Sequence, residues 1–195
     1  MQDCDVILAS ASPRRRELLR LVFNSFRVVV SSFDESSTPD QLDPGEAVMH
    51  SAEGKAGNVA GQFPEALVVA ADTIVVVDGE VLGKPKDSAD AARMLRKLSG
   101  RTHQVYTGVA VARNGSLHSD FERTEVTFRD VDTEMISRYL ASGEPMDKAG
   151  AYAIQGIGAV LVKAIDGCYF NVVGLPIYRL SLLLERFDIK PFSRA

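Results

Sequence analysis

The sequence of 195 residues predicts an α/β fold, and three observations indicate it. Short apolar runs alternate with segments of helical periodicity in the first half of the chain, a pattern typical of strands connected by helices. Residues 67–77 form the most apolar stretch, and their β-branched side chains predict a central strand. The pairs Asp78-Gly79 and Asn114-Gly115 are signals of hairpin turns between antiparallel strands.

The first two predicted elements are a strand over residues 6–9 and a helix over residues 13–23. Ser12 is typical of an N-cap and Pro13 of the first helical position. Three arginines, 14–16, then fall in the first turn, where the helix dipole disfavours basic side chains by about 0.3–1 kcal/mol each. A bound phosphate would compensate, because free backbone N–H groups and guanidinium groups both favour an anion. The alternative is the solvated basic face of an ordinary surface helix.

The remaining elements follow from the same kinds of signal. A strand at 26–30 leads into an acidic loop that contains Glu35, and ligands of α/β sheets often bind after strand ends. Apolar residues at helical spacing predict a helix over 45–63, with Lys55 beside its apolar stripe. The other predicted elements are a short strand beginning at Glu80, a helix from Asp87 or Ser88 to Gly100, strands at 103–112 and 117–128, a helix capped by Asp132 that ends before Gly143, a hairpin of 159–165 and 168–173, and a last helix that starts at Pro176.

Asp72 is the one carboxylate in the apolar run of residues 67–77. Burying an unpaired carboxylate is costly, so Asp72 should either emerge at a strand end or have a cationic partner. A structural Asp that closes a turn is the alternative, but a carboxylate placed in this way is more typical of a functional site.

Cations and carboxylates recur at the ends of predicted elements and in a glycine-rich loop over residues 144–158. The cations are Arg14, Arg15, Lys55, Lys84 and Lys148, and the carboxylates are Glu35, Asp72 and Asp147. Cations can clamp a polyphosphate, while carboxylates can hold a divalent ion and activate water, so this set indicates hydrolysis at a phosphorus centre. Ser10 and Ser12 are better explained as turn and cap residues than as nucleophiles, and the three histidines occur in unrelated contexts.

Composition and charge argue against other classes of protein. The net charge of −4 and the pI near 5.4 do not suit a nucleic-acid polymer or an anionic membrane surface as a partner. The sequence has no long apolar span, and its acidic N-terminus lacks the pattern of a signal peptide, so we expect a cytoplasmic protein. Cys4 and Cys168 have no paired spacing and are expected to be reduced thiols.

Several spaced segments together resemble the Maf family of nucleoside triphosphate pyrophosphatases. They are Ser-Ala-Ser-Pro-Arg-Arg-Arg-Glu-Leu-Leu from residue 10, Ala-Asp-Thr from 71, Gly-Lys-Pro from 83, Leu-Ser-Gly from 98, Thr-Gly-Val from 107, Glu-Pro-Met-Asp-Lys-Ala-Gly from 144, Ile-Gln-Gly from 154 and Val-Gly-Leu-Pro from 173. The resemblance implies that residues 1–195 form one domain with the fold of the inosine triphosphate pyrophosphatases. That fold has an elongated, twisted mixed sheet flanked by helices, and two lobes with a central cleft. The resemblance also implies hydrolysis of a nucleoside triphosphate to the monophosphate and pyrophosphate with a divalent cation, magnesium or manganese.

The resemblance assigns roles to individual residues. Asp72 matches the family's proton acceptor and, with Glu35, is expected to bind the metal. The phosphate-facing cations are Arg15, Lys55 and Lys84. Their neutralisation is expected to weaken binding or turnover with little change in thermal stability. The other substrate-binding positions are Ser10, Arg14, Thr73, Asp147, Lys148 and Gln155. Related sequences often carry a polar or charged residue where this chain has Gly54, which leaves the direction of the Lys55 side chain open.

Base preference divides the family into a branch that prefers dTTP and UTP and a branch that prefers 7-methyl-GTP. Arg14, Thr73 and Gln155 agree with the first branch, because the second tends to carry Trp, Gln and Glu at these positions. The expected substrates are therefore dTTP and UTP, with modified pyrimidine nucleotides as further candidates. Two alternatives stay open: a 7-methyl-GTP pyrophosphatase, and a nucleotide-binding regulator of septum formation with little turnover. The oligomeric state is also open, and a homodimer is one arrangement that would fit.

Overall fold

The computed structural model describes residues 5–39 and 41–190, and the chain divides into two compact units. Unit 1 comprises Met1–Asp72, Thr107–Glu122 and Gly174–Ala195, and unit 2 comprises Thr73–Tyr106 and Arg123–Val173. The chain therefore passes from one unit to the other within each of its three long strands.

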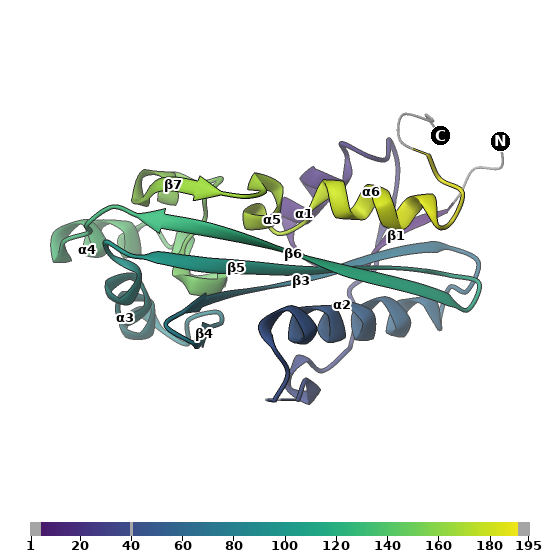
Figure 1. Ribbon diagram of the computed structural model, residues 1–195, viewed down its shortest axis with the longest axis horizontal. Helices are drawn as coiled ribbons and strands as arrows, with labels where there is room; N and C mark the ends of the chain where they lie inside the picture. The colour runs from purple at the N-terminus through teal and green to yellow at the C-terminus, as the bar shows by residue number, and fades with distance from the viewer. Residues whose placement is uncertain (1–4, 40, 191–195) are drawn as a thin grey trace. The chain divides into compact units, whose positions relative to one another are not determined.

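The strands are β1 Val6–Leu8, β2 Arg27–Val28, β3 Leu67–Val77, β4 Glu80–Leu82, β5 Thr102–Arg113, β6 Ser116–Phe128 and β7 Val162–Asp166 (Figure 1). They pair in the order β2-β1-β3-β5-β6-β7, and β4 pairs with β3. The pairs of β1 with β2 and β3 are parallel, whereas β3–β4 and β6–β7 are antiparallel, so the predicted mixed sheet is confirmed. Both predicted hairpin turns have positive φ at their two central residues, Asp78-Gly79 and Asn114-Gly115, as this kind of turn requires.

The α-helices are α1 Pro13–Leu19, α2 Pro44–Ala60, α3 Ser88–Leu98, α4 Thr133–Ala141, α5 Tyr169–Val173 and α6 Ile177–Glu185. Short 3-10 helices are η1 Glu35–Ser37, η2 Glu144–Asp147, η3 Ala149–Ala151 and η4 Ile157–Leu161. Most predicted elements are confirmed, although α1 ends at Leu19 rather than at residue 23 and β2 has only two residues. Within residues 5–39 and 41–190, no helix has the length and apolar character needed to cross a membrane.

The core of unit 1 forms where α2 packs against the sheet, over β1, β3 and β5 (Figure 1). Its side chains are mostly small: Ile7, Ala9, Ala52, Ala56, Val59, Ala66, Val68, Ala70, Ala110 and Ala112. Small side chains allow close approach, and at Gly108 in β5 a Cβ atom would overlap the backbone of Val48 in α2. The helix that carries Lys55 is therefore held tightly against its sheet.

The core of unit 2 includes a buried aromatic cluster around His103. The ring of His103 is 1% exposed and makes edge contacts with Phe128 and Tyr152, at centroid distances of 5.0 and 5.4 Å. Its Nε2 atom is 2.8 Å from the Tyr152 hydroxyl. Burial lowers the pKa of His103 to about 4, so the ring is neutral at pH 7, as suits a structural histidine.

The predicted hairpin of 159–165 and 168–173 is wrong: its first strand begins only at Val162, after η4, and its second strand does not form. Strand β7 pairs with β6 instead, and residues 169–173 form helix α5. The Asn171 side chain explains this difference, because its Nδ2 atom donates to Val105 O and to Thr124 Oγ1, both at 2.9 Å. These buried hydrogen bonds to two long strands outweigh the β propensity of the local sequence. The neighbouring Cys168 forms no disulfide with any described residue, and Cys4 lies outside the described ranges.

Candidate active site

The first part of the site lies in unit 1, at the turn from β1 into α1. Ser12 is the N-cap of α1, and its Oγ atom accepts a hydrogen bond of 3.4 Å from Arg15 N. The buried Ser10 accepts hydrogen bonds from Ser12 N and from Arg15 Nη1, at 3.2 and 3.3 Å. The predicted roles of both serines as turn and cap residues are confirmed, and Ser10 also fixes the guanidinium group of Arg15.

The Arg15 guanidinium is held from two sides. In addition to its contact with Ser10, its Nε atom donates to Gly174 O at 2.8 Å. Desolvation lowers the pKa of Arg15, while the negative charges of Asp72 and Glu35 act in the opposite direction. Arg15 therefore has structural partners of its own, and it also lies within electrostatic range of the two carboxylates predicted for the site.

Lys55, Asp72 and Glu35 come together at one point. Lys55 is on α2, Asp72 on β3 and Glu35 at the start of η1. The ammonium nitrogen of Lys55 lies 2.7 Å from Asp72 Oδ1 and 2.7 Å from Glu35 Oε1. The Lys55 and Asp72 side chains are 10% and 15% exposed, whereas that of Glu35 is 58% exposed. The predicted cationic partner of Asp72 is thus Lys55, and the direction of the Lys55 side chain is settled.

The two carboxylates that contact the Lys55 ammonium group, those of Glu35 and Asp72, are also the ones expected to bind a metal ion. No cluster of three or more potential metal-ligating side chains occurs within residues 5–39 and 41–190. Magnesium is usually bound by one or two protein carboxylates together with substrate phosphates and waters, rather than by an all-protein cage. Glu35 and Asp72 fit such a site, because contact with the same ammonium group places the two carboxylates near each other and Glu35 is exposed to solvent.

Of the other predicted residues, Arg14 lies in α1 of unit 1 and the rest belong to unit 2. Thr73 directly follows Asp72 in β3, and Lys84 is exposed just after β4. Lys148 forms an ion pair with its neighbour Asp147, and Gln155 is exposed in the loop between η3 and η4. The predicted clamp that joins Lys84 to the cations of unit 1 stays a prediction.

Glu144, the first residue of the glycine-rich segment 144–158, was not singled out from the sequence. Its carboxylate accepts hydrogen bonds from Gly158 N, Ile157 N and the Tyr139 hydroxyl at 2.9, 3.0 and 2.8 Å. Although desolvation acts to raise the pKa of Glu144, these hydrogen bonds lower it overall. The contacts close the segment from 144 to 158 on itself. At Gly156 and Gly158 a Cβ atom would overlap Glu144 and Tyr139, respectively. These two glycines are therefore the feature of the sequence that could have indicated the close contacts of Glu144.

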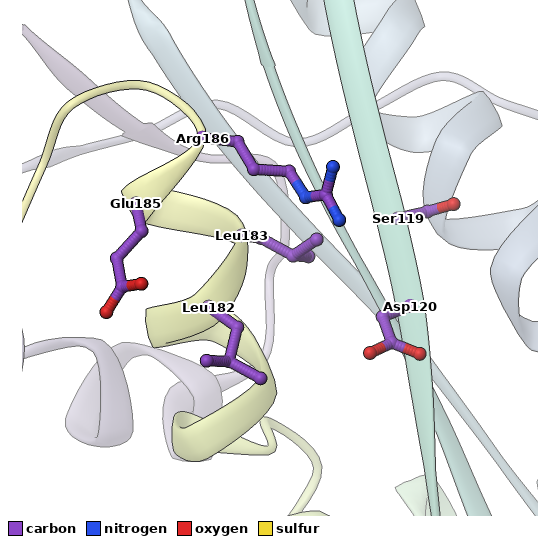
Figure 2. A pocket seen from close by; sticks show the side chains of 6 residues that line it. All are labelled: Ser119, Asp120, Leu182, Leu183, Glu185 and Arg186. Atoms are coloured by element: carbon purple, nitrogen blue, oxygen red, sulfur yellow. The ribbon is translucent and has the colours of Figure 1, made fainter.

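A separate surface pocket of 510 Å³ occurs in unit 1 between β6 and α6 (Figure 2). Its lining residues are Ser119, Asp120, Leu182, Leu183, Glu185 and Arg186. None of these is a predicted site residue. Asp120 accepts a hydrogen bond from Arg179, and Ser119 donates one to Glu53, so polar groups of the lining are already paired within the protein. The pocket carries no part of the proposed chemistry.

Comparison with known proteins agrees with the resemblance seen in the sequence. The family model described as Maf-like protein matches residues 5–187, which include every predicted site residue. A protein of Pelotomaculum thermopropionicum named dTTP/UTP pyrophosphatase is 50% identical over 185 residues, covering 94% of this chain and 96% of the relative. A protein of Bacillus pumilus with the same name is 50% identical over 187 residues, covering 96% and 98%.

A solved structure supports the fold class. The Ham1 protein of Staphylococcus aureus superposes with a TM-score of 0.51 at 16% sequence identity, covering 94% of this chain and 97% of that protein. The predicted α/β fold with a mixed sheet is thereby confirmed, and this chain shares it with the Ham1 protein.

Proposed function

Because this chain belongs to the Maf-like protein family, we propose that it is a pyrophosphatase that hydrolyses dTTP and UTP to the nucleoside monophosphate and pyrophosphate. The observation that carries the proposal is the convergence of Asp72, Glu35 and Lys55 beside the guanidinium of Arg15. This cluster combines two cations with two carboxylates that are potential metal ligands, one of which is also the proposed proton acceptor, and these are the groups that hydrolysis of a phosphoanhydride requires.

In the proposed reaction, Asp72 accepts a proton from a water molecule whose oxygen forms a bond to the α-phosphorus. The bond between the α-phosphorus and the α–β bridging oxygen breaks, and pyrophosphate leaves. The ion pair of Lys55 with Asp72 Oδ1 orients the Asp72 carboxylate for this proton transfer. Arg15 and Lys55 neutralise charge that builds up on the phosphate oxygens, and Lys84 is assigned the same role by its match to the family motif.

Glu35 and Asp72 would hold the divalent cation, magnesium or manganese. When bound, this ion would supply positive charge to the phosphate groups in addition to that of the two cations.

Base preference gives the test of the substrate assignment. We propose that Arg14, Thr73 and Gln155 select the pyrimidine base, since an amide can both donate to a uracil-type carbonyl and accept from its ring N–H. Because each bidentate pair contributes about 1–3 kcal/mol, kcat/KM for dTTP and UTP should exceed that for 7-methyl-GTP and ATP by about tenfold or more. Pyrophosphate release is measured over a panel that includes modified pyrimidine triphosphates.

The variant Gln155→Glu should reduce this preference, because a carboxylate cannot donate to the base carbonyl. Gln62→Glu, at an exposed glutamine in the turn that follows α2, is the matched control and should leave the ratio unchanged. A higher kcat/KM for 7-methyl-GTP in the unmodified protein would move the chain to the other branch. Tight binding of dTTP without pyrophosphate release would instead indicate a nucleotide-binding regulator.

A further inference from the structure

The ring of Phe33 occupies the space beside Gly54, next to the proposed catalytic cluster. A Cβ atom on Gly54 would overlap three atoms of this ring. Gly54 directly precedes Lys55 on α2, and Phe33 lies two residues before Glu35. The ring therefore joins the two segments whose side chains form the 2.7 Å ion pair between Lys55 and Glu35.

Hydrogen bonds attach the loop of residues 31–38 to α2 on both sides of the contact between Phe33 and Gly54. Asn58 Oδ1 accepts from Ser31 Oγ and Ser32 N, both at 3.0 Å. Beyond Glu35, the Thr38 hydroxyl lies 3.0 Å from the Ser51 hydroxyl. Residues 51, 54 and 58 fall on one side of α2, since they are separated by three and four positions. Residues 31–38 are thus fixed along two turns of the helix that carries Lys55.

We propose that Phe33, seated against Gly54, is a positioning residue that sets Glu35 against Lys55 for metal and phosphate binding. The role of Glu35 in this statement rests on the proposed function. Glu35 needs such support because its side chain is 58% exposed and η1 has only three residues, so its own packing cannot fix it. Long-range contacts of Phe33 and Asn58 supply the fixed position instead.

Gly54 and Gly57 make a matched pair for testing this role. Glycine in a helix interior costs about 1 kcal/mol relative to alanine, so either substitution by alanine should favour α2 itself. At Gly57 a Cβ would meet nothing within 4 Å, whereas at Gly54 it would displace the Phe33 ring. Gly54→Ala should therefore favour the helix itself while it displaces the Phe33 ring and, through the ring, Glu35. Comparison with Gly57→Ala then distinguishes a change in helix stability from a change in the position of Glu35.

The experiment compares Gly54→Ala, Gly57→Ala, Phe33→Ala and Phe33→Ala/Gly54→Ala with the unmodified protein. Amide hydrogen exchange of residues 33–37 is measured without nucleotide or metal, because Ser36 N and Ser37 N are bonded to Asp34 in the folded loop. The magnesium concentration for half-maximal dTTP hydrolysis, kcat at saturating magnesium, and Tm are measured on the same samples.

Gly54→Ala should speed exchange at residues 33–37 and raise the magnesium requirement by about tenfold, the size of effect that partners supporting a metal ligand commonly have. Its kcat at saturating magnesium should change little. Gly57→Ala should raise Tm slightly and leave exchange and magnesium dependence unchanged. Phe33→Ala should resemble Gly54→Ala, and the double variant should be no worse than Phe33→Ala, because the overlap disappears with the ring.

Normal exchange and normal magnesium dependence in Gly54→Ala and Phe33→Ala would overturn the proposal. Additive effects in the double variant would also overturn it, since they would show that Gly54 does not act through Phe33. The exchange measurement uses no substrate, so its outcome is independent of whether the protein hydrolyses dTTP. A protein that fails to hydrolyse any nucleotide but shows the expected exchange pattern would contradict the proposed function alone.

Discussion

Asp72→Asn is expected to lower the turnover of dTTP by about a hundredfold or more, since a positioned general base contributes about 10²–10⁴ to the rate. Asparagine has nearly the same size as aspartate but cannot accept the proton of the attacking water. The fold should survive, because Lys55 keeps its ion pair with Glu35 at 2.7 Å when the Asp72 charge is removed. Steady-state kinetics and circular dichroism spectra of the two proteins provide the measurement.

Asp78→Asn is the matched control for this variant. Asp78 is exposed in the turn after β3 and has a φ of 50°, a conformation that asparagine adopts readily. The turnover of the Asp78→Asn variant should equal that of the unmodified protein. Near-normal turnover in Asp72→Asn would remove Asp72 from the role of base.

Lys55→Met should cost both activity and stability. Methionine keeps an unbranched side chain of similar length but leaves Asp72 and Glu35 without the ammonium group between them. Turnover should fall by about a hundredfold, the loss that follows removal of one donor to a developing negative charge. The free energy of unfolding should fall by about 2 kcal/mol, less than for a fully buried ion pair, because Glu35 is exposed and water screens its charge.

This expectation revises the one drawn from the sequence, in which neutralising a phosphate-facing cation leaves thermal stability nearly unchanged. Arg15 is subject to the same revision, because it donates to Gly174 O and to Ser10.

The control for Lys55→Met is Lys163→Met, at an exposed lysine of β7, which should change neither turnover nor stability. Urea unfolding curves and dTTP kinetics are compared. Lys55→Met with unchanged stability would contradict the ion-pair account, and with unchanged turnover it would remove Lys55 from the phosphate clamp.

Local signals in the sequence were sufficient for most of the fold. Asn114-Gly115 requires positive φ at both positions, which makes the β5–β6 turn almost independent of its surroundings. Ser12-Pro13 likewise defines the start of α1, because the geometry of a helix cap and first turn depends on residues that are adjacent in the sequence. Asp72 could be selected as a site residue since a carboxylate in an apolar strand needs a partner, and the structure supplies Lys55.

Contacts between residues far apart in the chain could not be predicted in this way. The hydrogen bond from Arg15 to Gly174 O spans 159 positions, and nothing in either local sequence indicates it. Helix α5 forms because Asn171 bonds to two long strands, whereas its apolar neighbours favour a strand locally. Gly54 weakens α2 when considered alone, and its purpose becomes clear only when the Phe33 ring is seen beside it.

The most direct test of the proposed reaction is hydrolysis of dTTP in ¹⁸O-labelled water, with the products analysed by mass spectrometry. Attack of water on the α-phosphorus places one ¹⁸O atom in the phosphate group of dTMP and leaves pyrophosphate unlabelled. We expect this result with the unmodified protein, and product formation that depends on Asp72. Formation of dTDP and inorganic phosphate, or of labelled pyrophosphate, would contradict the account, because water would then have attacked the γ- or β-phosphorus.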